Sequence, residues 1–384
     1  MADRPPLVVA VNTLSVSETN EGTKTLVQGL LPALAKVAPE IRQLLVCSPR
    51  NRHLFTHDAD TVVIDLDHAR VVRRIALDQL AVPRLVRGRA DVLVSAAGLP
   101  TLPTRLPQVM VVSHHFVLPS CRRAAGQEGP PHSRQLYYGA PFRLAMRRST
   151  SVLAISQYLA DGLVHELHAD PARVRAMPLG VDPPTTVPTL TGRRTELLFV
   201  GTLYAYKRVD LAIEALGLAR DRLPADARLV VIGKDPDGLQ VDRLRAIAAT
   251  AGVADRLDLL GVVDGPDLEE RYRAASALVL ASRYEGFGLP VAEAMSRATP
   301  AIVADTTSLP EVVGDGGLVV PAGDAAAFAD AYVALLTDEP RRLVLAERAL
   351  RRGSGLTWDA TASILRDAIH DATLGRGATS PRRG

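Results

Sequence analysis

The chain has 384 residues, which is long for one hydrophobic core and an ordinary length for two domains. Apolar residues make up 47% and charged residues 23%, a globular composition, and the formal net charge of +3 is too small to indicate a nucleic-acid partner. The two cysteines, Cys47 and Cys121, have no metal or redox spacing, so we expect no disulfide and a cytoplasmic location. The first apolar run, residues 7–11, is too short for a signal peptide or a membrane span.

Short apolar runs alternate with longer amphipathic stretches, which predicts βαβ units and parallel sheets covered by helices on both faces. In the first half we expect strands at Leu7–Val11, Arg42–Cys47, Thr61–Ile64, Asp91–Val94, Gln108–Val112 and Ser151–Ile155, and helices at Thr23–Ala35, Arg70–Arg87, Ser133–Arg148 and Gln157–Leu167. In the second half we expect strands at Leu197–Gly201, Arg228–Ile232, Leu257–Leu260, Ala277–Leu280, Ala301–Ala304 and Gly317–Val320, and helices at Val209–Ala219, Leu239–Ala251, Pro266–Ala274, Pro290–Arg297, Asp324–Leu336 and Pro340–Arg351.

A stretch rich in proline, threonine and glycine, residues 183–192, separates the two halves and carries no periodic apolar pattern. We therefore expect a first domain at 1–184 and a second domain at 193–356. A further helix is expected at 357–374, followed by a disordered tail at 375–384 that is rich in Gly, Pro and Arg. Ligands of open α/β sheets bind at the carboxyl ends of the strands, so we expect the chemistry on loops that follow strands, in a cleft between the domains.

The segment Ala281–Met295 follows one expected strand and opens an expected helix. A proline suits the first turn of that helix, and Gly286 and Gly288 permit tight turns and a close approach of a ligand. The free N–H groups of such a turn, with the helix dipole, form a site for anions or sugar hydroxyls. Glu285 and Glu293 bracket the turn, and carboxylates accept hydrogen bonds from the diols of ribose and hexose rings. The alternative is that Glu285 caps the helix and Glu293 is a surface residue.

A second segment, Leu197–Asp210, places a strand before Gly201 and a helix near Arg208. Lys207 and Arg208 stand where that helix begins. A cation at this point would neutralise a leaving diphosphate. The alternative is an ordinary solvated pair of basic residues.

These motifs together resemble retaining glycosyltransferases of family 4, which have the GT-B architecture. The segment Glu285–Glu293 resembles the family's E-x7-E motif, and Phe199–Lys207 resembles its donor-phosphate motif. The resemblance extends over most of the chain through Ala154–Tyr158, Pro178–Asp182, Thr299–Asp305 and Ser308–Asp315. It implies an α/β fold of two Rossmann-like, doubly wound parallel-sheet domains that face each other across a cleft, with a C-terminal helix that crosses back to the first domain. Trp358 would pack at that crossing.

The resemblance also implies residue roles. Glu293 would hold the nucleotide ribose, Glu285 would bind hydroxyls of the donor sugar, and Lys207 would sit on the diphosphate. The remaining donor-binding residues would be Gly201, Thr202, Arg208, Gly286, Phe287, Gly288 and Leu289.

One departure from the family pattern lies beside Lys207. Relatives usually have an Arg just before the Lys or just after the strand glycine, where this chain has Tyr206 and Thr202. Arg208 would then substitute from the other side of Lys207. If it does not, stabilisation of the leaving group is weaker.

Three features of the first domain are weaker signals. Gly22 and Thr23, after the first strand, resemble the family's loop that faces donor and acceptor, although such βα turns are common. His115, after the strand that ends at Val112, is in the region where relatives carry a His that contacts the transferred sugar or acceptor; a structural or exposed His is the alternative. The basic stretch 70–89 is compatible with a weak peripheral membrane contact, but a solvated helix face is favoured, given the excess of arginine.

The predicted function is retaining transfer of a hexose from a GDP- or UDP-linked sugar to a glycan, lipid-linked or small-molecule acceptor, by a metal-independent enzyme with no cofactor. The Gly-Thr-x4-Lys form resembles mannosyltransferase-like members. Two alternatives remain open. One is a nucleotide-sugar 2-epimerase of the same fold, and the other is a nucleotide-sugar-binding protein that has lost its catalytic activity.

Overall fold

A computed structural model describes residues 6–17, 21–55, 59–64, 78–96, 101–102, 104–125 and 139–374. The chain divides into two compact units. The N-terminal unit contains residues 1–180 and 358–384, and the C-terminal unit contains residues 181–357. The predicted tail 375–384 lies outside the described residues.

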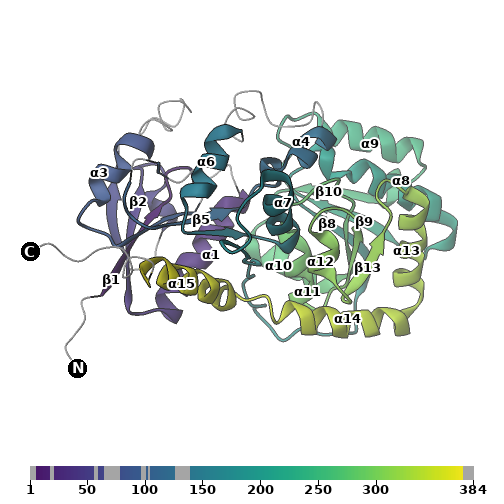
Figure 1. The fold of residues 1–384 in the computed structure, drawn as a ribbon. Helices are drawn as coiled ribbons and strands as arrows, with labels where there is room; N and C mark the ends of the chain where they lie inside the picture. Colours follow the sequence, from purple (N-terminus) through teal and green to yellow (C-terminus); the bar gives the residue numbers. More distant parts are fainter. Residues whose placement is uncertain are drawn as a thin grey trace, which may run out of the picture. The chain divides into compact units, whose positions relative to one another are not determined.

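The N-terminal unit is built on a parallel seven-stranded sheet with the order β3-β2-β1-β4-β5-β6-β7 (Figure 1). Its strands are β1 (Leu7–Asn12), β2 (Ile41–Cys47), β3 (Asp60–Val63), β4 (Val92–Ser95), β5 (Gln108–Val112), β6 (Ser151–Ala154) and β7 (Val174–Ala176). The central strands β4, β5 and β6 are buried along their whole length, because helices cover both faces of such a sheet. The order reverses direction between β1 and β4, which makes the unit doubly wound.

The described helices of this unit are α1 (Glu21–Val37), α3 (Val82–Val86), α4 (Pro119–Ala125), α6 (Ala140–Arg148), α7 (Gln157–Leu167) and α15 (Trp358–Leu374). The last helix packs along α1, so the end of the chain completes the first unit. Trp358 is buried, and its ring occupies the space where a side chain on Gly29 of α1 would stand. Trp358 therefore packs against α1 at Gly29, in agreement with its predicted packing role.

The C-terminal unit has a parallel six-stranded sheet with the order β10-β9-β8-β11-β12-β13 (Figure 1). Its strands are β8 (Arg194–Val200), β9 (Arg228–Ile232), β10 (Leu257–Gly261), β11 (Ala275–Leu280), β12 (Ala301–Ala304) and β13 (Gly317–Val320). Its helices are α8 (Val209–Ala219), α9 (Gln240–Thr250), α10 (Gly265–Ala274), α11 (Leu289–Ser296), α12 (Leu309–Val313), α13 (Ala325–Thr337) and α14 (Glu339–Gly353). Here the strand order reverses between β8 and β11.

The prediction of two Rossmann-like units with doubly wound parallel sheets is confirmed. Six elements have the predicted bounds: Gln108–Val112, Gln157–Leu167, Val209–Ala219, Arg228–Ile232, Ala301–Ala304 and Gly317–Val320. The three-residue strand β7, helix α4 and helix α12 were not predicted, since short elements carry too little periodicity. The predicted helix 133–148 is seen as α6 from Ala140, with residues 133–138 outside the described part.

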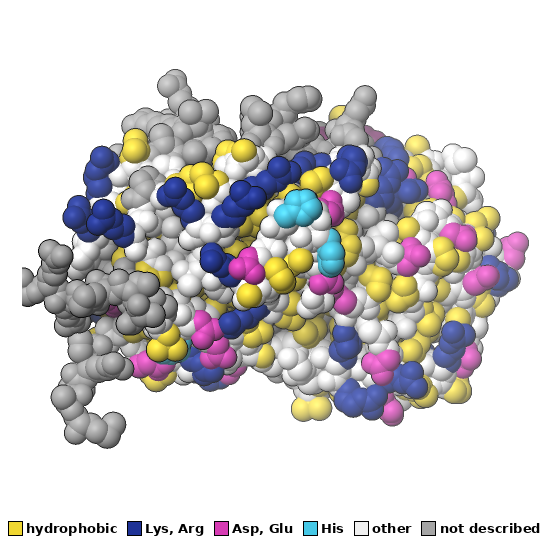
Figure 2. Space-filling view, viewed as in Figure 1, with side chains coloured by type: hydrophobic (Ala, Val, Ile, Leu, Met, Phe, Trp, Pro, Cys, Tyr) yellow, Lys and Arg dark blue, Asp and Glu magenta, His cyan; other side chains and the backbone are white. Residues whose placement is uncertain are grey.

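The basic stretch 70–89 is described only from residue 78, where α3 forms its last part. Exposed arginines also lie on α6, at Arg143, Arg147 and Arg148, and Figure 2 shows basic side chains gathered over this part of the unit. No helix among the described residues is both long and apolar enough to cross a membrane. A peripheral membrane contact stays a prediction.

Candidate functional site

The predicted donor-binding residues meet at one edge of the C-terminal sheet. Residues 201–208 follow β8, residues 281–288 follow β11, and residues 305–308 follow β12. These three strands are neighbours in the sheet, and the strand order reverses between β8 and β11. Ligands of doubly wound sheets bind outside the carboxyl ends of the strands at such a reversal.

Lys207 and Glu285 form the centre of this edge. Lys207 ends a short 3-10 turn, η4 (Ala205–Lys207), and its Nζ lies 2.5 Å from Oε1 of Glu285. The side chains are only 12% and 10% exposed. Oε1 also accepts a 2.7 Å hydrogen bond from the hydroxyl of Ser282, whereas Oε2 accepts none from the residues that the structure describes. One oxygen of this carboxylate is thus left without a partner among the described residues, and Lys207 is not a solvated surface cation.

The turn between Glu285 and α11 presents backbone donors. The N–H groups of Gly286, Phe287, Gly288 and Leu289 donate no hydrogen bond to any described residue. Gly288 is the N-cap of α11 with φ 101°, a conformation that disfavours a side chain, and a Cβ there would lie 2.9 Å from Leu309 Cδ2. Free N–H groups at a helix start attract anions and hydroxyl oxygens. Because Gly288 caps this helix, the alternative that Glu285 is its cap is wrong.

Glu293 lies inside α11 and is partly buried. The phenol of Tyr272, in α10, donates a 2.6 Å hydrogen bond to Oε2 of Glu293. Burial raises the pKa of Glu293 above its ordinary value, while Tyr272 and the nearby Arg297 oppose that shift. The other oxygen, Oε1, accepts no hydrogen bond within the described part of the chain. Glu293 is therefore held from one side and open to a ligand at the other oxygen.

Three tyrosines stack on one another beside Lys207, and sequence reasoning assigned none of them a supporting role. Tyr206 stacks on Tyr284 with ring centroids 4.7 Å apart, and Tyr204 stacks on Tyr206 at 5.6 Å. Nζ of Lys207 lies 5.5 Å from the centre of the Tyr206 ring, within the range of a cation–π contact. Burial, with the Glu285 carboxylate next in effect, raises the pKa of Tyr206, so its phenol stays protonated. The position where relatives usually have an Arg thus holds an aromatic support for Lys207.

Arg208 points to a different partner. It has the left-handed φ of 55°, and its Nε lies 3.1 Å from Oδ1 of Asp210. Asp210 also pairs with Arg243 at 3.3 Å. The guanidinium of Arg208 is therefore committed to Asp210 and not to Glu285, and its predicted substitution for the family's Arg stays untested.

The glycine after β8 permits a close backbone contact. Gly201 has φ 152°, and its N–H donates to the carbonyl of Ile232 at the end of β9. Gly233 has φ 158°, and a Cβ there would collide with the carbonyl oxygen of Gly201. Thr202, which follows Gly201, is partly exposed at the start of the loop after β8. Two glycines thus let the ends of β8 and β9 approach each other at this edge of the sheet.

The remaining predicted residues belong to the N-terminal unit. Gly22 and Thr23 lie in the first turn of α1; Thr23 is buried, and a side chain on Gly22 would meet no atom within 4 Å. His115 follows β5 in a short 3-10 turn, is 9% exposed, and has its ring 4.2 Å from that of Phe116. Gly22 and Thr23 thus come after β1, and His115 comes after β5, as predicted. The functional roles of these three residues stay predictions.

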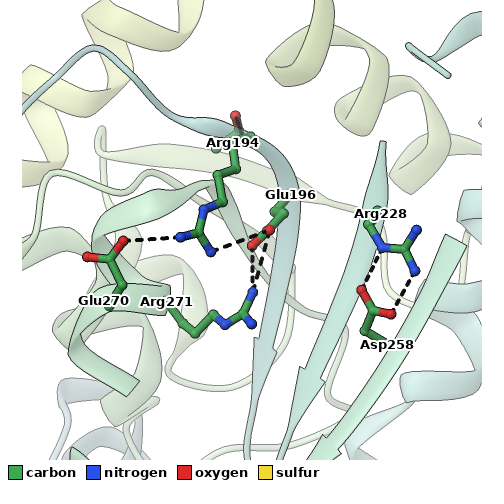
Figure 3. A network of polar contacts seen from close by, with 7 residues as sticks. Arg194, Glu196, Arg228, Asp258, Glu270 and Arg271 are labelled. Carbon is green, nitrogen blue, oxygen red and sulfur yellow. Dashed lines mark hydrogen bonds and ion pairs between the residues drawn. The ribbon is translucent and has the colours of Figure 1, made fainter. Parts of the chain in front are cut away.

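A second charged cluster of the C-terminal unit lies near the amino ends of β8, β9 and β10 (Figure 3). Arg194 and Glu196 are in the first half of β8, and Arg271 of α10 pairs with Glu196 at 3.3 Å. Arg228, the first residue of β9, binds both carboxylate oxygens of Asp258, at 2.6 and 2.7 Å. These charges satisfy one another at the amino ends of the strands, so this cluster is structural. Within the described residues, no group of three or more His, Cys, Asp or Glu side chains is placed to hold a metal ion.

Residues 187–352 match the sequence profile of the family described as Glycosyl transferases group 1. The C-terminal unit belongs to this family. The D-inositol 3-phosphate glycosyltransferase of Stackebrandtia nassauensis is 36% identical over 242 residues, which are 58% of this chain and 54% of that protein. The protein of the same name from Xylanimonas cellulosilytica is 32% identical over 249 residues, 60% of this chain and 59% of that protein. The chain thus matches little more than half the length of these curated relatives.

Solved structures extend the likeness to both units. The sucrose-phosphate synthase of Thermosynechococcus elongatus has a TM-score of 0.73 at 18% identity, over 96% of this chain and 100% of that one. Anabaena Alr3699/HepE in complex with UDP and glucose also has a TM-score of 0.73, at 16% identity, over 95% of this chain and 99% of that one. At these identities the likeness is one of fold, and the fold is the GT-B fold. The residues that match the group 1 family, 187–352, include Lys207, Glu285 and Glu293.

Proposed function

We propose that the chain transfers a hexose from a nucleotide-diphosphate sugar to an acceptor hydroxyl, with retention at the anomeric carbon and without a metal ion or cofactor. One observation carries this proposal. Four backbone N–H groups in the turn before α11 and at its first residue donate to no described residue, and they follow directly on Glu285, which is paired with the largely buried Lys207. A helix N-terminus beside a cation suits the negative charge of a diphosphate, and open carboxylate oxygens suit sugar hydroxyls.

In the proposed reaction the bond between the sugar C1 and the phosphate oxygen breaks, and the acceptor oxygen bonds to C1 from the same face. The acceptor proton passes to the departing phosphate oxygen, so no protein base is required. Lys207 and the N–H groups of the turn stabilise the charge that develops on the phosphate. Oε2 of Glu285 accepts from a donor-sugar hydroxyl, and Oε1 of Glu293 accepts from the ribose diol.

The donor and acceptor are proposed from the relatives. A UDP-linked hexose is the first candidate donor because Anabaena Alr3699/HepE was solved with UDP and glucose, and a GDP-linked hexose is the second. The candidate acceptors from the sequence are glycans, lipid-linked acceptors and small molecules. The relatives named D-inositol 3-phosphate glycosyltransferase suggest a phosphorylated polyol as a further candidate acceptor for this chain. We propose a cytoplasmic location, in agreement with two buried free thiols.

A donor screen tests the proposal. The purified chain is mixed with UDP- and GDP-linked hexoses, and the shift in melting temperature is measured for each. The donor that stabilises the protein is then incubated with and without acceptors, in the presence of EDTA, and the products are identified by NMR. We expect release of the nucleoside diphosphate and a product with the donor's anomeric configuration.

Two variants with one charge removed serve as a matched pair in that assay. Lys207→Ala should abolish most transfer, whereas Arg245→Ala, an exposed residue of α9 in the same unit, should retain it. Formation of an epimer of the donor without acceptor would support the epimerase alternative. Donor binding without hydrolysis or transfer would support a protein that only binds nucleotide sugars.

A further inference from the structure

Three consecutive hydroxyl side chains after β12 hold the turn that contains Glu285. Oγ1 of Thr306 donates to the carbonyl of Ser282 at 2.8 Å, and Oγ1 of Thr307 accepts from the N–H of Glu285 at 2.8 Å. Oγ of the fully buried Ser308 donates to the carbonyls of Glu285 and Phe287, at 3.2 and 3.0 Å. The backbone of Glu285 is thus fixed at both its N–H and its C=O.

Thr307 makes its contact from an unfavourable backbone conformation. Its φ is 48°, in the left-handed region, where the other non-glycine residues of the described part are His168, Arg208 and Ala298. Thr307 is the β-branched member of this group, and β-branched side chains are the ones that this region tolerates least. Backbone strain of this kind persists where the surrounding structure enforces it, and it concentrates at functional sites.

Because the backbone of Thr307 is strained, the requirement of the fold at this position can be compared with the requirement of the site. A glycine at residue 307 would adopt the same φ without a steric cost, so the backbone alone does not call for threonine. What glycine would lack is the oxygen that accepts the N–H of Glu285. The threonine is therefore explained by its hydroxyl and not by its backbone.

We infer that Thr307 is a positioning residue for the transfer step, which holds Glu285 so that its carboxylate meets both Lys207 and the donor sugar. This inference rests on the proposed function. The hydroxyl fixes the amide of Glu285, and the three N–H groups that follow, those of Gly286, Phe287 and Gly288, take their direction from it. A small displacement of this turn would misalign the carboxylate and the N–H groups together.

The test compares three variants with the wild-type chain by melting temperature and by kcat and KM for the donor. Thr307→Gly removes the hydroxyl and relieves the strain, and Thr307→Ser keeps the hydroxyl. Ala298→Gly relieves a comparable strain, at φ 58°, in a buried residue outside the site, and so controls for the glycine itself.

We expect Thr307→Gly to keep or raise the melting temperature while kcat falls by about tenfold or more, since misplacement in a site costs up to about a hundredfold. Thr307→Ser should stay within about threefold of wild-type kcat, the size of a modest positioning change. Ala298→Gly should keep wild-type kcat with an equal or higher melting temperature.

Wild-type kcat and KM in Thr307→Gly would overturn the inference. So would a fall in melting temperature that accompanies the loss of turnover, because the residue would then act through folding. A wild-type chain that neither binds nor turns over any nucleotide sugar would instead reject the proposed function, and the inference with it.

Discussion

Lys207 and Glu285 form an ion pair although 78 positions separate them in the sequence. Their loops follow β8 and β11, which are neighbours at the reversal of strand order. Because the pair is largely buried, loss of either partner leaves a charge that water solvates poorly.

Lys207→Met and Glu285→Gln should each lower kcat by about 100-fold, the effect of removing one group that stabilises charge in a transition state. Each should also lower the free energy of unfolding by about 2 kcal/mol, because the remaining partner keeps a desolvated charge or loses a charge-assisted hydrogen bond. The double variant should lose less than the sum of the two. Urea denaturation and steady-state kinetics on the four proteins measure both effects. Additive losses of stability, or near-normal turnover in either single variant, would contradict this assignment.

Glu293→Gln should weaken donor binding by about tenfold, the value of one hydrogen bond to a charged group. It should also change the dependence of stability on pH. Burial raises the folded-state pKa of Glu293, so the folded state binds the proton more tightly than the unfolded state does. The contribution of Glu293 to stability therefore falls as the pH rises from the ordinary carboxyl pKa through the raised folded-state pKa.

Relative to wild type, the Gln variant should consequently be more stable at pH 8 than at pH 4. Urea unfolding at the two pH values and titration with the donor measure these two effects. An unchanged donor affinity would remove Glu293 from the site, and a pH-independent difference in stability would contradict its electrostatic environment.

Gly233→Ala should destabilise the C-terminal unit by more than about 2 kcal/mol, because the new Cβ meets backbone, which cannot rotate away. Gly238→Ala is the matched control: it has φ 69°, also unfavourable for alanine, but nothing lies within 4 Å of its Cβ. That variant should cost about 1 kcal/mol, the strain of the left-handed conformation alone. Equal unfolding midpoints for the two variants would show that the close approach of β8 and β9 is not what requires Gly233.

Asp258→Asn should reduce stability near neutral pH by about 1 kcal/mol, a modest value because the pair with Arg228 is partly exposed and screened. The hydrogen bonds from Arg228 lower the pKa of Asp258. A lowered folded-state pKa gives stability above the unfolded pKa, and this stability is lost as the pH falls through the folded value. The difference between wild type and variant should therefore shrink below about pH 4, near the ordinary Asp pKa. A difference that is constant from pH 7 to pH 3 would contradict the ion pair shown in Figure 3.

The sequence was sufficient to predict the described strands except β7, and to place Lys207 and Glu285 on loops that follow strands. Both residues follow apolar runs that predict parallel strands, and the carboxyl ends of parallel strands share one edge of a sheet. The same reasoning predicted a helix from Pro290, because a proline suits the first helical position, and the observed helix begins one residue earlier, at Leu289.

Other parts of the site could not be predicted because they depend on contacts between distant segments. Tyr272 reaches Glu293 across 21 positions, and Thr307 reaches Glu285 across 22. A threonine gives no sign in the sequence that its φ will be positive, since its preference is for extended backbone. The turn of Arg208 toward Asp210 is a local contact, but the sequence alone does not choose between that acid and Glu285.

The insertion of β11 beside β8 also has a consequence for how this unit assembles. The chain runs outward through β9 and β10 before it returns to β11, so a long-range pairing of β11 with β8 brings together the two loops that bear the opposite charges. Closing so long a loop has an entropic cost and slows folding. A nascent chain that ends before β11 therefore carries Lys207 without Glu285, and the ion pair between them forms only when β11 is in place beside β8.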